Sequence, residues 1–295
     1  MRKLTFIFFV FFLFSQSCLF SFQNEKWLSP SGIAVGVSYR TLQPGEVIAL
    51  KIEKQQGIEA AKVIFLGKEY RMGKDSQGLK LMAFIGLDLS LQPGEYPIKI
   101  FLEDKNGLWQ MFERKIVISP KQFPLIKLWV EQKYVTPPPE VRQRIKREAE
   151  ILKTIYSMFS SQWWSDGAFI MPVSGRITAQ FGERRVYNNQ PRSSHSGLDI
   201  AASAGTPVRA SNSGQVVLAA ELYFSGKTVI INHGLGVFTI YCHFSKIRVK
   251  RGQQVRKGET IGEVGATGRV TGPHLHWGVK IFGSRVDPSA LLSFR

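Results

Sequence analysis

Short runs of β-branched and aromatic residues, each about the length of one strand, recur along most of this chain between turn residues. Six of them precede residue 120, at a spacing that is typical of an all-β sandwich. The sequence therefore predicts an Ig-like β-sandwich over residues 28–120. The predicted strands are 33–39, 47–54, 61–66, 79–87, 96–103 and 109–118.

Two copies of the pentapeptide Leu-Gln-Pro-Gly-Glu, at 42–46 and 91–95, punctuate this first region. Proline presets φ at the second position of a turn and glycine tolerates positive φ at the third, so both copies predict type II turns. No histidine, cysteine or carboxylate cluster occurs here. The sandwich is therefore expected to be an accessory domain, without catalytic groups of its own.

A triple proline, Pro137-Pro138-Pro139, separates the first β region from the one strong helical pattern in the chain. Because the first helical turn needs no backbone donor, Pro139 is well placed to begin a helix. The pattern predicts a helical linker over residues 137–165 with a solvated basic face, and a nucleic-acid-reading helix is the less favoured interpretation. Its apolar residues recur at three-, four- and seven-residue steps: Val141, Ile145, Leu152, Ile155 and Phe159.

Glycine becomes frequent in the last part of the chain, where 17 of the 27 glycines follow residue 166. Brief apolar segments alternate there with glycine turns, which is typical of short strands in a compact sheet. The sequence predicts that residues 166–295 form a small antiparallel β sandwich or barrel-like domain. The fold class expected for the whole chain is thus mainly β.

The charge balance and the N-terminus together predict where the protein acts. Lys plus Arg outnumber Asp plus Glu by 39 to 22, a formal charge of +17, which implies a polyanionic neighbour. Arg2 and Lys3 precede an apolar run, and small residues follow it, so residues 1–22 read as a secretory signal peptide. An uncleaved membrane anchor is the second interpretation, and lipidation of Cys18 the third. We expect an exported protein of the periplasm or cell envelope, acting on an envelope polymer and not on nucleic acid.

All five histidines fall between residues 195 and 276, inside the predicted C-terminal domain. His195 lies four residues before Asp199, and His274 and His276 would share one face of a strand. Two histidines and one carboxylate are ligand types that leave a catalytic zinc with an open position. On the strand that His243 ends, Tyr241 would share its face and Cys242 would point oppositely, which predicts a further histidine near the site. His233 reads as a turn residue, and no role is assigned to it.

These segments resemble a known family, the lysostaphin/LytM-type zinc metallopeptidases of peptidoglycan. The resemblance covers roughly residues 168 to 292. It implies a small antiparallel β fold with a groove, a single Zn²⁺ and cleavage of peptide cross-links in peptidoglycan. By this likeness His195, Asp199 and His276 match the metal ligands, whereas His243 and His274 match two catalytic histidines that do not bind the metal. The segments that carry it are Ser194–Asp199, Tyr241–His243, Gly265–Gly268 and Gly272–Trp277.

The chemistry of such a site suggests roles for the remaining groups. Because the sequence has no His-Glu-x-x-His motif, His274 is the expected general base, with His243 expected to donate to the developing oxyanion. Arg192 is expected to pair with a substrate carboxylate, and Tyr187 is a weaker substrate-binding candidate from the loop before the first ligand. We expect a monomer.

Two other functions fit parts of the sequence. A non-catalytic LytM-type protein could bind the wall and activate another hydrolase, although such proteins lack ligands that this chain retains. A lipoyl- or biotin-carrier domain would need a modifiable lysine at a hairpin tip, and no suitable context is visible.

Overall fold

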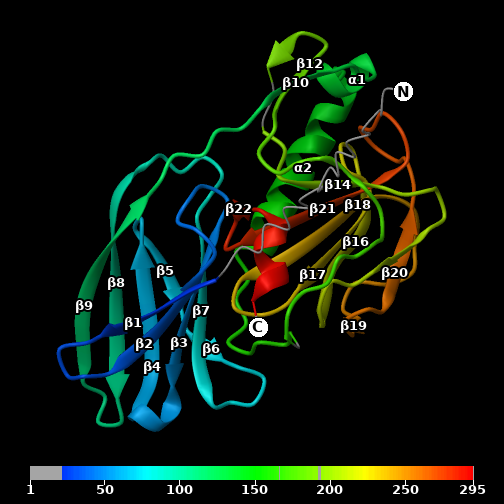
Figure 1. Ribbon diagram of the computed structural model, residues 1–295. Helices are drawn as coiled ribbons and strands as arrows, with labels where there is room; N and C mark the ends of the chain where they lie inside the picture. Colours follow the sequence, from blue (N-terminus) through cyan, green and yellow to red (C-terminus); the bar gives the residue numbers. More distant parts are fainter. Residues whose placement is uncertain (1–21, 166, 192–193, 295) are drawn as a thin grey trace, which may run out of the picture.

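The computed structural model describes residues 22–165, 167–191 and 194–294, and it confirms a mainly β chain of antiparallel sheets (Figure 1). Residues 1–21 of the predicted signal peptide, like Arg192, lie outside these described residues. No helix in the described ranges is long and apolar enough to cross a membrane.

Residues 23–118 form two antiparallel sheets that enclose one apolar core. All six predicted strands are present, with ends within three residues of the predicted ones. Three further strands escaped prediction because they are short or polar and owe their conformation to pairing. The first sheet holds, in order, β1 (Gln23–Leu28), β2 (Ala34–Tyr39), β3 (Val47–Glu53), β7 (Lys80–Gly86) and β6 (Gly73–Lys74). The second holds β5 (Lys68–Arg71), β4 (Ile58–Phe65), β8 (Gly94–Asp104) and β9 (Trp109–Ile118).

The first Pro-Gly turn has the predicted form. The amide of Glu46 donates to the carbonyl of Gln43 at 3.1 Å. Gly45 has a φ of 91°, a conformation that residues with a Cβ rarely adopt. A Cβ there would also lie 2.4 Å from the ring of Phe181, so the position requires glycine for packing as well.

A large antiparallel sheet forms the C-terminal half of the molecule. Odd-numbered residues of its central strand β21, such as Leu275 and Trp277, are fully buried in the core, whereas the even-numbered ones face the opposite side. Its main path is β11 (Ile177–Ala179), β14 (Gly197–Ala201), β21 (His274–Ile281), β18 (Val237–Ile247), β17 (Gly226–Asn232), β16 (Gly214–Leu222) and β19 (Gln254–Val255). Strands β15 (Pro207–Arg209), β20 (Thr260–Val264) and β22 (Ser284–Val286) attach to it.

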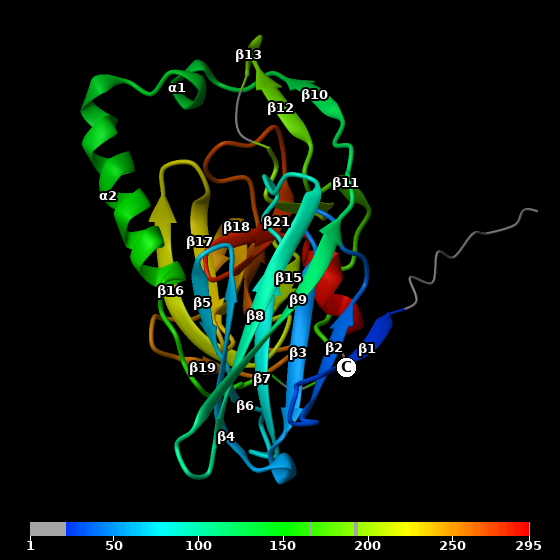
Figure 2. The same cartoon turned by 90° about the vertical axis from the view of Figure 1, so that its left-hand side faces the viewer.

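The linker between the halves folds back over one end of the large sheet. Figure 2 shows β10 (Leu125–Leu128), α1 (Gln132–Val135) and α2 (Pro139–Tyr156) following one another as an arch. Strand β10 pairs in parallel with β12 (Arg184–Tyr187), which forms a hairpin with β13 (Gln190–Pro191). The predicted helix is therefore present, and it begins at Pro139 as expected.

The C-terminal end of the apolar stripe of α2 packs on the large sheet. Ile155 and Tyr156 are buried against Leu218, Leu222 and Phe238, with Leu152 beside them. The linker helix is thus part of the C-terminal half and forms one wall above its sheet.

Candidate metal centre

Two neighbouring strands and the segment before the first of them bring the predicted ligands together, although 81 residues separate the first ligand from the last. Asp199 on β14 lies directly opposite His276 on β21, and His195 immediately precedes β14. Gly197 makes this approach possible, because a Cβ at that position would lie 2.8 Å from Cε1 of His276. The ligand strands can therefore pair only if this residue is glycine.

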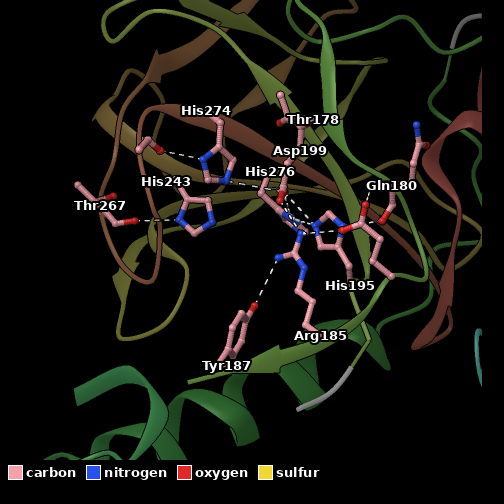
Figure 3. A network of polar contacts seen from close by, with 12 residues as sticks. Thr178, Gln180, Arg185, Tyr187, His195, Asp199, His243, Thr267, His274 and His276 are labelled. Atoms are coloured by element: carbon pink, nitrogen blue, oxygen red, sulfur yellow. Dashed lines mark hydrogen bonds and ion pairs between the residues drawn. The ribbon is translucent and has the colours of Figure 1, made fainter. Parts of the chain in front are cut away.

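The ligand atoms of His195, Asp199 and His276 converge on one point (Figure 3). His195 Nε2 lies 2.9 Å from Asp199 Oδ1 and 2.9 Å from His276 Nδ1, and the last two atoms are 2.8 Å apart. His195 and Asp199 are buried, with 4% and 7% of their surface exposed. Two imidazole nitrogens and one carboxylate oxygen fit a zinc ion by donor type, and they leave room in its coordination shell for a further ligand.

Hydrogen bonds and burial favour the tautomers and charge states that metal binding requires of the three candidate ligands. The Nδ1–H of His195 donates to the Gln180 carbonyl at 2.8 Å, which leaves the Nε2 lone pair facing the site. Burial lowers the pKa of His276, which favours a neutral ring. Burial alone would raise the pKa of Asp199, but its close polar contacts with His195 and His276 hold that pKa well below its usual range.

The second carboxylate oxygen of Asp199 is held by an arginine that the sequence analysis did not select. A guanidinium nitrogen of Arg185 donates to Asp199 Oδ2 at 2.7 Å, opposite the oxygen that faces the histidines. The same guanidinium lies 3.4 Å from the hydroxyl of Tyr187. Only the pairing of β12 beside the site reveals this contact, because Arg185 stands in an Arg-Arg pair that carries no spacing signal.

His243 and His274 form a second pair beside the ligands, with ring centroids 4.9 Å apart. Their Nδ1–H groups donate to the carbonyls of Thr267 at 2.8 Å and Gly272 at 2.9 Å. Both Nε2 atoms are therefore acceptors, and that of His274 lies 3.7 Å from Asp199 Oδ1. Burial and the neighbouring histidines His276 and His274 lower the pKa of His243 to about 3, so this ring is neutral at physiological pH.

The sequence predicted that Tyr241 shares the strand face of His243 and that Cys242 points away, and this prediction was wrong. Cys242 and His243 both line the cleft, whereas Tyr241 is buried on the other side, where its hydroxyl accepts a hydrogen bond from the Ser211 amide. The pairing of β18 is irregular at this point, and His243 has a φ of 68°. A residue with a Cβ rarely adopts this conformation, and such strain is concentrated at functional sites.

An open cleft of about 610 Å³ exposes the candidate centre. Tyr187, at the end of β12 and not in a loop, lines this cleft, with the Arg269 guanidinium 4.7 Å from its ring centroid. His233 lies away from the cleft, buried with hydrogen bonds to Ser213 and Thr239. The linker supplies one wall of the cleft through Ile126, Leu128 and Val130 from β10 and its end, and Leu152 and Tyr156 from α2.

Comparisons with known proteins agree on the C-terminal half. Residues 193–288 match the model of peptidase family M23. The chain is 44% identical over 113 residues to the peptidoglycan DD-endopeptidase ShyA of Vibrio cholerae, a match that covers 38% of this chain and 26% of that protein. It is 44% identical over 116 residues to the DD-carboxypeptidase/endopeptidase Mpg of Neisseria meningitidis, covering 39% and 27%. The chain thus matches about a quarter of the length of these relatives.

One solved structure extends the likeness beyond that half. A crystal structure from Pseudomonas aeruginosa, assigned to the M23 peptidases, superposes with a TM-score of 0.66 at 33% identity. The match covers 85% of this chain and 95% of the other. Both the strands before the linker and the large sheet therefore have a counterpart in one known structure.

Proposed function

The chain belongs to peptidase family M23, and we propose that it is an exported zinc endopeptidase that cleaves peptide cross-links of peptidoglycan. The observation that carries the proposal is a buried His-His-Asp cluster flanked by two histidines whose Nε2 atoms face an open cleft. The named activities of ShyA and Mpg support the choice of substrate. The positive charge of the chain and its N-terminal sequence support action on an envelope polymer.

We propose that His195, Asp199 and His276 hold the zinc ion. Bound there, zinc would act as a Lewis acid that polarises the scissile carbonyl and makes water more acidic. Arg185 would keep the Asp199 carboxylate ionised and oriented through its 2.7 Å contact with Oδ2. The Gln180 carbonyl would keep the Nε2 of His195 unprotonated.

We propose that His274 is the general base. Its Nδ1–H is committed to the Gly272 carbonyl, so Nε2 is free to take the proton of the attacking water and to return it to the leaving amine. A neutral His243 has no proton at Nε2, which favours orienting the water over the oxyanion-donating role expected from the sequence. Tyr187 and the walls from the linker would position the peptide, and Arg192 keeps its predicted carboxylate-binding role.

Digestion of isolated peptidoglycan tests the proposed function. The zinc-loaded protein should convert cross-linked muropeptide dimers into monomers and leave the glycan strands intact, as measured by mass analysis of the products. Removing the metal with a chelator should abolish turnover, and added zinc should restore it. Zinc-loaded protein that leaves the cross-links unchanged would contradict the proposal and favour the wall-binding activator.

A further inference from the structure

Lys280 extends the line of side chains that carries the histidines. It occupies an even-numbered position of β21, as His274 and His276 do, and it lines the same cleft. Four residues separate it from His276, which places the two Cα atoms about 13 Å apart at the rise of ~3.3 Å per residue. Gly278 stands between them on the same strand face and adds no side chain there.

The ammonium group of Lys280 lies against an aromatic ring and forms no ion pair with any of the described residues. Its Nζ lies 4.3 Å from the ring centroid of Tyr156 on α2. No carboxylate in the described part of the chain lies within ion-pair distance of it, and no acceptor takes a hydrogen bond from its three donors. A ring face attracts a cation but offers no lone pair, so the hydrogen-bonding capacity of Nζ remains available.

Two other cations of the same region do form ion pairs. Arg185 in the cleft donates to Asp199, and Arg285 on the neighbouring strand donates to Asp88 at 2.7 Å. Burial, followed by the positive charge of Arg285, lowers the pKa of Lys280, and the negative charge of Asp88, which Arg285 already binds, offsets only part of this effect. An anion that entered the cleft would relieve this cost.

The surface between the histidines and Lys280 is apolar. Ile230 and Ile240 line the cleft from β17 and β18, and Leu222 lines it from the end of β16. A ligand that fits this arrangement has a scissile peptide bond at one end, a small apolar stretch, and an anionic group on the order of 10 Å away, as the strand rise sets it. Peptide stems that carry free carboxylates have this chemistry.

We propose that Lys280 binds a free carboxylate of the cross-linked peptide and makes the enzyme selective for substrates that carry that charge. The inference rests on the proposed function and goes beyond it by naming the group that is recognised and the residue that recognises it. Tyr156 acts as the positioning residue, because its ring holds the ammonium group at the end of the cleft.

Paired substrates test the proposal. Two synthetic cross-linked peptides are compared, identical except that the stem carboxylates of one are amidated. Zinc-loaded wild-type protein should show a KM roughly 10- to 100-fold lower for the free acid, the range expected of a charge-assisted hydrogen bond. Lys280→Met should remove this preference with kcat nearly unchanged, whereas Lys280→Arg should keep most of it. Lys250→Met, at an exposed lysine outside the cleft, is the matched control and should behave as wild type.

Equal KM values for the two peptides in the wild type would overturn the role of Lys280, as would a Lys280→Met variant that retained the preference. Equilibrium binding of the same peptides to both proteins separates this inference from the proposed function. If neither peptide is cleaved but the wild type alone binds the free acid more tightly, the role of Lys280 stands and the endopeptidase proposal fails. Equal binding to both proteins would reject the role of Lys280 whatever the activity.

Discussion

Backbone carbonyls decide how three of the histidines in the cleft can act. The carbonyls of Gln180, Thr267 and Gly272 accept from the Nδ1–H of His195, His243 and His274. His276 differs, because it turns Nδ1 itself toward Asp199 at 2.8 Å. These bonds alone do not separate the proposed ligands from the proposed proton carriers, because His195 shares the pattern of His243 and His274.

A comparison of two variants within β21 tests which histidines bind the metal and which carry protons. His276→Ala should lose tightly bound zinc, because it removes one of the three ligands that we propose. His274→Ala, two residues away on the same strand face, should keep one zinc per chain and lose activity about 100-fold or more. Metal analysis after dialysis, together with turnover on peptidoglycan, measures both. A full equivalent of zinc in His276→Ala would show that the ligand assignment is wrong.

Arg185 should raise the zinc affinity of the candidate site without binding the metal itself. Arg185→Met removes the donor to Asp199 Oδ2, and loss of such a contact typically weakens metal binding about 10- to 100-fold. Arg184→Met is the matched control, because Arg184 is exposed and does not line the cleft. Competition with a chromogenic chelator gives the zinc affinity of each protein. Equal affinities in the two variants would limit Arg185 to a structural contact.

At the scale of elements, the β12–β13 hairpin connects the linker to the candidate site. Its two turn residues, Asn188 and Asn189, have φ values of 47° and 62°, which asparagine tolerates better than most residues. The side chain of Asn188 accepts from the Val130 amide and donates to the Val130 carbonyl, both at 3.0 Å. The side chain of Asn188 thus joins the hairpin that carries Arg185 to the end of β10, which lines the cleft.

Glycine substitutions at Asn188 and Asn189 distinguish the backbone turn from the side-chain hydrogen bonds to Val130. Asn188→Gly keeps the positive φ but loses both side-chain hydrogen bonds to Val130, so amide exchange in residues 125–130 should accelerate. Asn189→Gly keeps the turn and the bonds, so it should leave that exchange unchanged. Hydrogen exchange followed by mass spectrometry measures both variants. Unchanged protection in Asn188→Gly would show that the backbone pairing of β10 with β12 suffices.

At the scale of the whole molecule, the sandwich and the large sheet share a core. Val47 and Phe84 of the first region pack in one cluster with Val237 and Ile281 of the second. A chain cut at residue 166 would leave this face of the large sheet exposed, which favours aggregation of the isolated C-terminal piece. Ion pairs border the cluster, among them Arg285 with Asp88 and Arg40 with Glu46 and Asp287.

The Asp88–Arg285 pair should make this interface sensitive to acid. Burial alone would raise the pKa of Asp88, but hydrogen bonds from Arg285 and Ser90 hold it well below its usual range. The carboxylate therefore stabilises the folded chain above the unfolded pKa of about 4 and loses this contribution as the pH falls toward the folded value. Asp88→Asn should have a lower Tm than the wild type at pH 7, and the gap should narrow at pH 3. A gap that is independent of pH would contradict the prediction.

Much of the fold and of the candidate site follows from the sequence because its signals are local. Alternation along a strand puts His274 and His276 on one face, and Pro139 begins the helix for a steric reason that needs no tertiary contact. The spacing of His195 and Asp199 is a weak signal by itself, and it predicts a ligand pair only in combination with His274 and His276.

Only the tertiary structure decided which distant residues meet these groups. Arg185 reaches Asp199 because β12 is laid beside the site by its parallel partner β10, which precedes it by more than fifty residues. The irregular pairing at His243 shifts the strand by one residue, and the placement of Lys280 opposite Tyr156 depends on where α2 packs. Covalent geometry sets the direction of a side chain relative to its neighbours in sequence. Contacts between distant residues depend instead on how whole elements pair and bury their surfaces, and neither segment alone carries a pattern that reveals such a contact.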